Sequence, residues 1–222
     1  MNRKRGVILL SGGMDSATLL YLAKRSGYDA TCLIFDYGQR HRKEITAAQR
    51  IARRAGCNAH LVKINLPWKG STLLDKKVKL PKGDIHSRSI PSTYVPARNI
   101  IFLSFALSCA EAINARAIFI GAHTEDYSGY PDCRKEFFSA FKEVVKKGTK
   151  AGSKDKGIAI EVPLINSSKK EIVWLANSLK VPLELTWSCY QGARLPCGKC
   201  DSCLYRAKGF LEAGLKDPLH DR

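Results

Sequence analysis

Short apolar runs alternate with stretches of helical periodicity along most of the chain. The apolar runs predict strands at residues 6–10 (GVILL), 30–35 (ATCLIF), 58–64, 117–121 and 158–162. Apolar residues that recur at helical spacing predict helices at residues 16–25, 42–55, 99–113, 137–147 and 169–179. Apolar strands that alternate with helices predict the α/β class, with an open parallel sheet covered by helices on both faces.

Two segments stand apart from this alternation. Residues 66–91 contain three prolines, two glycines and several lysines, which predicts a long, partly mobile loop of the kind that is usually functional. Residues 186–222 contain a cysteine cluster, and we expect them to form a small helical appendage packed on a domain of residues 1–185.

The chain is strongly basic, with 37 Lys and Arg against 20 Asp and Glu and a formal net charge of +17. This excess favours anionic partners such as nucleotides, phosphates or RNA, although a solubilising surface explains it equally well. No apolar run approaches the ~20 residues that span a bilayer, and the N-terminus lacks the apolar core of a secretory signal. We therefore expect a cytoplasmic protein with no membrane partner.

The first predicted strand runs into two adjacent glycines flanked by serines, within LLSGGMDSATLLYL at residues 9–22. A strand, a glycine-rich turn and a helix together present backbone N–H groups and the positive end of a helix to a phosphate. We expect Gly12 and Gly13 to adopt positive φ, and Ser11 and Ser16 to donate hydroxyl hydrogen bonds. The turn lacks the lysine of a Walker A motif, so a capped turn without a ligand stays open as an alternative.

The six residues SGGMDS, directly after the first strand, resemble the PP-loop of the N-type ATP pyrophosphatases, which have an adenine nucleotide alpha hydrolase-like fold. The resemblance implies that the loop grips the pyrophosphate part of ATP while the α-phosphate goes to the substrate. The implied ATP-binding residues are Leu10, Ser11, Gly12, Gly13, Met14, Asp15, Ser16, Ala17, Thr18, Leu19 and Leu20. We expect Asp15 to help hold Mg²⁺ and Lys169 to supply positive charge, with Lys170 as a solvated alternative.

Four of the eight cysteines cluster near the C-terminus as C-x7-C-x2-C-x2-C. Four thiolates at this spacing, from Cys189, Cys197, Cys200 and Cys203, are typical of a closed, tetrahedral, structural Zn²⁺ site. A redox dithiol and an iron–sulfur cluster are the weaker alternatives.

Three polar segments lie beside predicted strands or begin a helix: FDYGQRH at 35–41, VPARN at 95–99 and EDYSGYPDCR at 125–134. Ligands bind at the carboxyl ends of the strands in open α/β sheets, so we expect these segments on one rim. Together with SGGMDS, the SKKE before a helix and the C-terminal cysteines, they resemble the 7-cyano-7-deazaguanine synthases, the QueC family, over about residues 6–210.

The resemblance implies an ATP-dependent carbon–nitrogen ligase of queuosine and archaeosine biosynthesis. Such an enzyme converts 7-carboxy-7-deazaguanine and ammonia into 7-cyano-7-deazaguanine (preQ0) through adenylation and an amide intermediate. It often forms a homodimer and needs no nucleic acid, although the basic charge leaves an RNA partner open. Because positioning and electrostatic stabilisation carry this chemistry, no protein nucleophile is expected.

Candidate roles follow from the chemistry of the side chains. A carboxylate such as Asp132 or Asp126 is expected to accept N–H donors of the deazaguanine ring, and Tyr127, Tyr130 or Phe35 to stack on it. The planar fork of Arg98 suits the substrate carboxylate or a phosphate. The expected catalytic residues are Asp15, Arg98, Lys169 and Asp132, and the expected substrate-binding residues are Phe35, Tyr37, Gln39, Arg98, Asn99, Asp126, Tyr127, Tyr130 and Asp132.

Two other functions stay open. One is a related enzyme that activates a tRNA base for thiolation or amidation, which the net charge of +17 favours and in which Cys133 is a candidate sulfur carrier. The other is a non-catalytic module that binds a nucleotide and zinc.

Overall fold

A single parallel sheet organises the protein. The computed structural model describes residues 3–87, 89–123, 130–154 and 157–219. Within these residues the strands are β1 (Lys4–Leu9), β2 (Tyr28–Asp36), β3 (Asn58–Lys63), β4 (Ala117–Phe119) and β5 (Ala159–Glu161). They lie in the order β3-β2-β1-β4-β5, and every pair of neighbours is parallel. The predicted open parallel sheet is confirmed.

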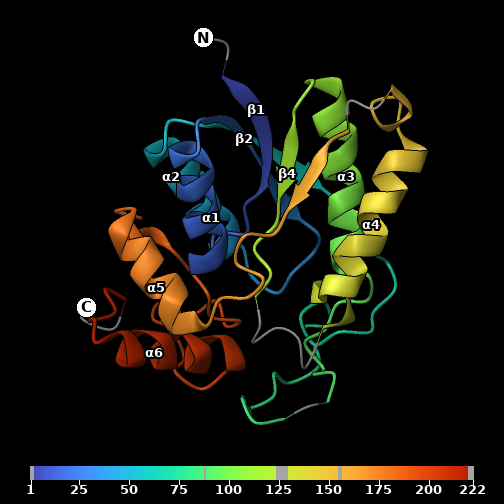
Figure 1. Ribbon diagram of the computed structural model, residues 1–222. Helices are drawn as coiled ribbons and strands as arrows, with labels where there is room; N and C mark the ends of the chain where they lie inside the picture. Colours follow the sequence, from blue (N-terminus) through green and yellow to red (C-terminus); the bar gives the residue numbers. More distant parts are fainter. Residues whose placement is uncertain (1–2, 88, 124–129, 155–156, 220–222) are drawn as a thin grey trace.

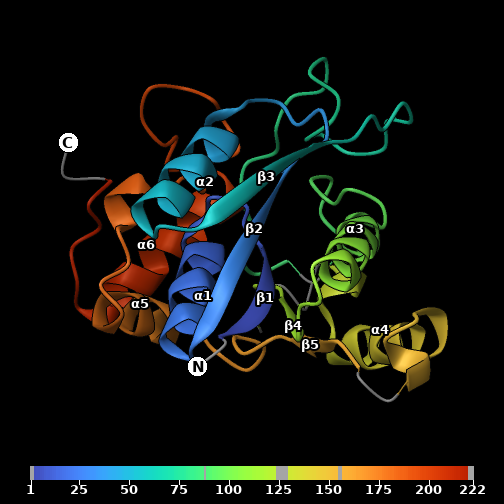
Figure 2. The same cartoon turned by 90° about the horizontal axis from the view of Figure 1, so that it is seen from above.

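Helices cover both faces of this sheet, as Figures 1 and 2 show. One face carries α1 (Met14–Arg25), α2 (Lys43–Arg54) and α5 (Lys169–Ser178), with α6 (Asp201–Ala213) packed against α5. The other face carries α3 (Arg98–Ala112) and α4 (Lys135–Gly148). Short 3₁₀ turns occupy Pro131–Cys133, Gly152–Lys154 and Leu183–Leu185.

Alternate residues of the central strands serve two apolar layers, because successive side chains of a strand point to opposite faces. On β1, Ile8 joins the layer of α1, α2 and α5, whereas Val7 and Leu9 join the layer of α3 and α4. On β2, Ile34 and Phe35 divide in the same way. With both faces covered, a central strand reads as a continuous apolar run, which is the pattern that identified β1 in the sequence.

The structure corrects several predicted boundaries. The strand at residues 58–64 is not apolar throughout: five of the six residues of β3 are exposed, because β3 is an edge strand. The helix expected from residue 16 begins at Met14, and the strand expected to reach residue 121 ends at Phe119. The helical appendage contains α6, whose Phe210 enters the layer of α1, α2 and α5. The domain division at residue 185 stays a prediction.

The strand order places a crevice at one end of the sheet. The chain leaves β1 toward β2 and β3 on one side and returns to β4 and β5 on the other, so β1 and β4 are neighbours at the switch point. In open α/β sheets ligands bind at the carboxyl ends of strands at such a point. The segments after β1 and β4 are the glycine turn and the region of His123. Among the described residues, no helix has the length and apolarity needed to cross a bilayer.

Candidate functional site

The glycine turn after β1 is shaped by two glycines with different tasks. Gly12 has φ +87°, and a Cβ there would lie 2.2 Å from the backbone oxygen of Glu44 on α2, so only glycine fits. Gly13 is extended, with φ −76° and ψ 166°, and the nearest atom to a Cβ there would be Ser11 Oγ, at 3.5 Å. The expectation of positive φ is therefore right for Gly12 and wrong for Gly13. The first glycine docks the turn on α2, and the second lines the cavity.

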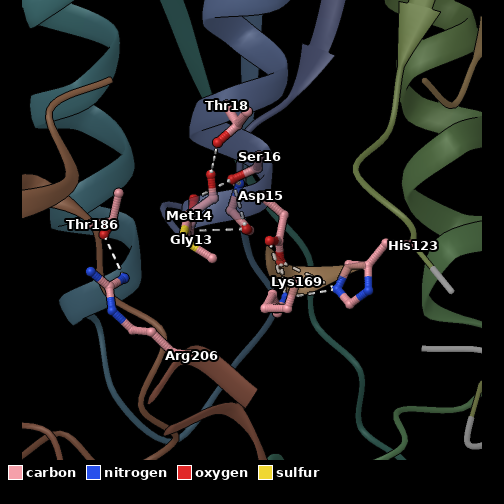
Figure 3. Close-up of polar contacts among 10 residues, drawn as sticks. Gly13, Met14, Asp15, Ser16, Thr18, His123, Lys169, Thr186 and Arg206 are labelled. Atoms are coloured by element: carbon pink, nitrogen blue, oxygen red, sulfur yellow. Dashed lines mark hydrogen bonds and ion pairs between the residues drawn. The ribbon is translucent and has the colours of Figure 1, made fainter. Parts of the chain in front are cut away.

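Hydroxyl groups fix the turn from within. Ser16 Oγ donates to Gly13 O at 3.1 Å and lies 3.2 Å from the backbone nitrogen of Ser11. Thr18 Oγ1 donates to Met14 O at 2.8 Å (Figure 3). The first N–H groups of α1 have no acceptor within the helix, and they end at the cavity that Gly13 and Met14 line. The turn thus offers backbone donors and a positive helix end to an anion.

Only the beginning of the predicted ATP-binding stretch reaches the cavity. Its lining includes Leu10, Ser11, Gly13, Met14, Asp15 and Ser16. The remaining helix residues of the stretch, Ala17, Thr18, Leu19 and Leu20, are fully buried. They hold the helix in place beneath the turn.

Asp15, Lys169 and His123 form a charged cluster from three elements. Lys169 is buried, and its Nζ donates to both Asp15 oxygens, at 2.9 and 3.1 Å, and lies 2.8 Å from Nε2 of His123 (Figure 3). Burial opposes ionisation of Asp15, yet Lys169 and His123 hold its pKa well below the ordinary value. Lys169, at the start of α5, therefore brings the positive charge that the turn lacks.

The alternative Lys170 points elsewhere, since its Nζ lies 4.4 Å from the ring centroid of Trp174. Sequence reasoning did not single out His123. Its signal was its position directly after β4, the strand beside β1 at the switch point.

A second polar group, made of Arg98, Tyr37, Glu44 and Gln39, lines the same cavity. Arg98 begins α3 directly after Ala97, a non-glycine residue in the left-handed region with φ 54°. Burial and nearby Glu44 raise the pKa of Tyr37 to about 12 against the opposing charge of Arg98, which also hydrogen-bonds it. Gln39 stabilises the chain at the end of β2, because its Oε1 accepts from Tyr37 N at 2.8 Å and its Nε2 donates to Phe35 O at 3.1 Å.

Burial raises the pKa of Glu44 to about 7, although Arg98 and a hydrogen bond from Gln39 favour its charged form. Sequence reasoning missed this residue. The only signal was a glutamate shortly after the FDYGQRH segment, in the first turn of α2.

Two of the expected substrate residues are engaged with neighbours. Phe35 stacks on Phe102, with ring centroids 4.0 Å apart and planes at 6°, and both rings line the cavity. Tyr130 also lines the cavity, and its hydroxyl lies 3.2 Å from Oγ1 of Thr93.

Asp132 lies off the cavity wall. Its side chain is buried and accepts from Asn99 N at 2.9 Å, so this carboxylate holds the start of α3. Asn99 itself lines the cavity, and its Nδ2 donates to Asp132 O and to Cys133 Sγ. Asp126 and Tyr127 lie outside the described residues.

These groups share one cavity of about 270 Å³. The glycine turn and the Asp15–Lys169–His123 cluster line it, and so does the Arg98–Tyr37–Glu44 group. Trp187, Ser188 and Tyr190 add a wall from the C-terminal segment. The cavity therefore joins an anion site with a polar, partly aromatic chamber, which is the composition of a small-molecule site.

The four clustered cysteines converge as the spacing predicted. The Sγ atoms of Cys189, Cys197, Cys200 and Cys203 lie within 4.8 Å of one another, and those of Cys197 and Cys203 are 4.0 Å apart. Sulfur atoms at ~2.3 Å from a tetrahedral Zn²⁺ are separated by about 3.8 Å, so the set fits this metal. Hydrogen bonds among the thiols lower the pKa of Cys189 and raise the pKa of Cys203.

This cysteine cluster is tied to the glycine turn. Trp187 N donates to Gly12 O at 2.9 Å, and Trp187 Nε1 donates to Cys189 O at 2.9 Å. His41, before α2, places Nε2 3.0 Å from the same Cys189 oxygen. The loop that carries the cysteine cluster therefore helps to hold the cavity wall.

A buried ion pair fixes the C-terminal tail. Arg206 on α6 donates two hydrogen bonds to Asp217, of 2.7 and 2.8 Å. It also donates to Thr186 Oγ1 at 2.8 Å (Figure 3). Both charged side chains are nearly inaccessible, at 3% and 6% exposure. No local motif marks this pair in the sequence, because its partners lie 11 residues apart and meet only where the chain folds back after α6.

Comparison with known proteins gives consistent results. The family described as "Queuosine biosynthesis protein QueC" matches residues 5–214. A 7-cyano-7-deazaguanine synthase of Nostoc sp. strain PCC 7120 is 52% identical over 97% of this chain and 96% of the relative. A 7-cyano-7-deazaguanine synthase of Thermoplasma acidophilum is 48% identical over 99% of this chain and 92% of the relative. Among solved structures, NMN synthetase from Francisella tularensis has a TM-score of 0.51 at 15% identity, covering 96% of this chain and 79% of that one, which shows the fold alone.

Proposed function

The chain belongs to the QueC family of queuosine biosynthesis proteins, and on that premise we propose that it converts 7-carboxy-7-deazaguanine into 7-cyano-7-deazaguanine with ATP and ammonia. The observation that carries the proposal is a single cavity bounded by an anion-binding turn and by the Arg98–Tyr37–Glu44 group. A carboxylate held in that chamber lies within reach of a nucleotide phosphate on the turn.

The anion-binding turn would bind the β- and γ-phosphates of ATP through its backbone N–H groups and the start of α1. Lys169 would neutralise charge that develops on the leaving pyrophosphate, while Asp15 keeps Lys169 oriented and offers an oxygen ligand to Mg²⁺. The α-phosphorus then faces the chamber. Attack by the substrate carboxylate on that phosphorus gives an acyl adenylate and releases pyrophosphate.

The chamber would hold the deazaguanine acid. Arg98 offers a planar pair of N–H donors to a carboxylate, and its position at the start of α3 is fixed by Ala97 and by the Asn99–Asp132 contact. Phe102, stacked on Phe35, would present an apolar face to the ring. Asp132 would act through α3, and Asp126 and Tyr127 stay proposed contacts to the ring.

We assign Zn²⁺ to the four cysteines, where it would link the C-terminal segment to the wall of the cavity. All four positions are taken by protein thiolates, so the metal would have a structural role. Thiolates that bind a metal fit the reducing cytoplasm, where we place the protein.

A homodimer is part of the proposal. Ile100 and Phe105 on α3 are each 44% exposed, and Leu61 on the edge strand β3 is 36% exposed. Such apolar surface suits burial against a second copy. Light scattering after gel filtration should give the mass of two chains, and Phe105→Glu should shift it toward one.

The experiment that tests the function is mass spectrometry of the products after the protein is mixed with 7-carboxy-7-deazaguanine, MgATP and ammonium. The nitrile should appear, and the primary amide should appear transiently before it. Omitting either ATP or ammonium should abolish both. Turnover of ATP without any nitrile would refute the proposal and would favour the alternative of tRNA base modification.

A further inference from the structure

The Glu44 carboxyl is a cavity group to which the proposed chemistry has so far given no task. Among the described residues that line the cavity, the carboxylates are Asp15 and Glu44. Glu44 belongs to the first turn of α2, and its backbone oxygen is the atom against which Gly12 packs. Its position is therefore fixed relative to the phosphate-binding turn, while its side chain faces Arg98 and Gln39.

The two cavity carboxyls differ in what they can do. Asp15 is held as an anion by Lys169 and His123, which makes it a weak base. Glu44 is partly buried, and its pKa of about 7 lets it both accept and release a proton near neutral pH. A general base works best when its pKa lies near the working pH. In the described part of the chain, Arg98 on α3 and Tyr37 after β2 are the ionisable groups that face Glu44.

The proposed reaction needs such a group. Ammonia exists at neutral pH mainly as ammonium, which has no lone pair with which to attack carbon. The same nitrogen must then shed further protons before a nitrile can form. Neither Lys169 nor Arg98 can accept a proton while positively charged.

We propose that Glu44 binds ammonium in the cavity and is the proton acceptor for the nitrogen that becomes the nitrile. This assignment rests on the proposed function of the same site. A Glu44 oxygen takes one proton from ammonium and becomes a carboxylic acid. The freed nitrogen lone pair attacks the acyl carbon, the carbon–oxygen bond to AMP breaks with its electron pair on AMP, and the nitrogen loses a second proton to give the amide.

The second half of the reaction uses the same base. A second ATP activates the amide oxygen, so that oxygen leaves with AMP when its bond to carbon breaks. The nitrogen gives up its last two protons as the carbon–nitrogen triple bond forms. Glu44 returns each proton to solvent between steps, which a carboxyl that titrates near neutral pH can do.

The test compares two nucleophiles in the Glu44→Gln variant. Hydroxylamine is largely neutral at neutral pH and needs no deprotonation before it attacks. We expect kcat/KM for ammonium to fall by about 10²–10⁴-fold. Formation of the hydroxamate from hydroxylamine should fall far less, and substrate-dependent exchange of pyrophosphate into ATP should persist. Glu143→Gln, on an exposed face of α4, is the matched control and should behave as the wild type.

The pH profile gives an independent measure. With Glu44→Gln, kcat/KM for total ammonium should rise tenfold per pH unit as free ammonia increases, whereas the wild type should level off above neutral pH. If Glu44→Gln does not fold, Glu44→Asp withdraws the carboxylate by one methylene and should show a smaller loss that is again selective for ammonium. Equal losses with both nucleophiles, or an unchanged rate with ammonium, would overturn the assignment. Failure of the proposed function itself would show differently, as absence of substrate-dependent exchange in the wild type.

Discussion

Replacing Gly13 by alanine separates the two tasks of the glycine turn. Gly13 has a backbone conformation that any L-residue adopts, and the nearest atoms to an added Cβ are Ser11 Oγ at 3.5 Å and Ser188 Oγ at 3.9 Å. The fold should therefore accept the methyl group. Glycine-to-alanine changes at compatible positions stabilise by ~0.4–1 kcal/mol, so Tm should hold or rise slightly.

The same methyl group should damage ATP binding. It would stand on the surface where we place the phosphates, between the turn and Ser188. Losing one or two hydrogen bonds to a charged phosphate costs about 1.5–3 kcal/mol each. The Kd for MgATP should rise by roughly 10–100-fold or more, since each ~1.4 kcal/mol is a factor of ten.

Gly12→Ala is the matched contrast. Its φ of +87° costs an alanine about 1–2 kcal/mol, and its Cβ would lie 2.2 Å from Glu44 O and 2.8 Å from Ala48 N. The turn must then move off α2, for a total of at least ~2–4 kcal/mol. At ~2–4 °C per kcal/mol for a chain of this size, Tm should fall by roughly 5–15 °C.

Thermal unfolding and calorimetric titration with MgATP decide between these expectations. Gly13→Ala should have an unchanged or slightly higher Tm and a weaker affinity for MgATP. Gly12→Ala should have a lower Tm. If Gly13→Ala bound MgATP as tightly as the wild type, the phosphates would not lie on this turn. If Gly13→Ala were as unstable as Gly12→Ala, the open space beside Gly13 would not accept a methyl group.

Three further predictions concern stability, metal and pH. Arg206→Met leaves Asp217 buried without its partner and should cost ~3–5 kcal/mol, seen as a lower guanidinium midpoint at unchanged slope. Cys203→Ser should abolish stoichiometric zinc in elemental analysis and weaken MgATP binding, because the cysteine loop is bonded to the glycine turn; a variant with full zinc would contradict the assignment. The pKa of Glu44 is 4.5 in the unfolded chain and about 7 in the folded chain. Folding therefore binds a proton between pH 4.5 and about 7, and the free energy of unfolding falls as pH rises through this range. Glu44→Gln should remove that slope, worth roughly 1–3 kcal/mol, and a slope that persists in denaturant titrations would exclude Glu44 as its source.

The fold was largely readable from the sequence because the central strands are buried on both faces. Continuous apolar runs such as β1 and β2 have no other common explanation when they alternate with helices. The edge strand β3 departs from that pattern, since its exposed residues are under no demand to be apolar. The apolar pattern of the sequence therefore predicts central strands better than edge strands.

The site was predictable where chemistry follows from local spacing. The convergence of the four cysteines and the positive φ of Gly12 both follow from short motifs, whereas the packing of Gly12 against α2 does not. Long-range partners were not predictable in this way. Lys169 was expected to supply charge at the turn, but its partner His123, 46 residues away in the chain, was not identified. The raised pKa of Glu44 arises from burial in a cavity that only the folded chain creates. Asp132 was expected to bind the substrate, and in the structure its carboxylate accepts a hydrogen bond from Asn99 N at the start of α3.

The proposed function requires the turn after β1 to hold ATP so that the substrate carboxylate attacks its α-phosphorus. The most direct measurement uses 7-carboxy-7-deazaguanine labelled with oxygen-18 in its carboxylate, followed by mass spectrometry of the nucleotide and phosphate products. The label should be transferred to AMP, and pyrophosphate should stay unlabelled. Label in inorganic phosphate with formation of ADP would contradict it, because the attack would then occur at the other end of the triphosphate.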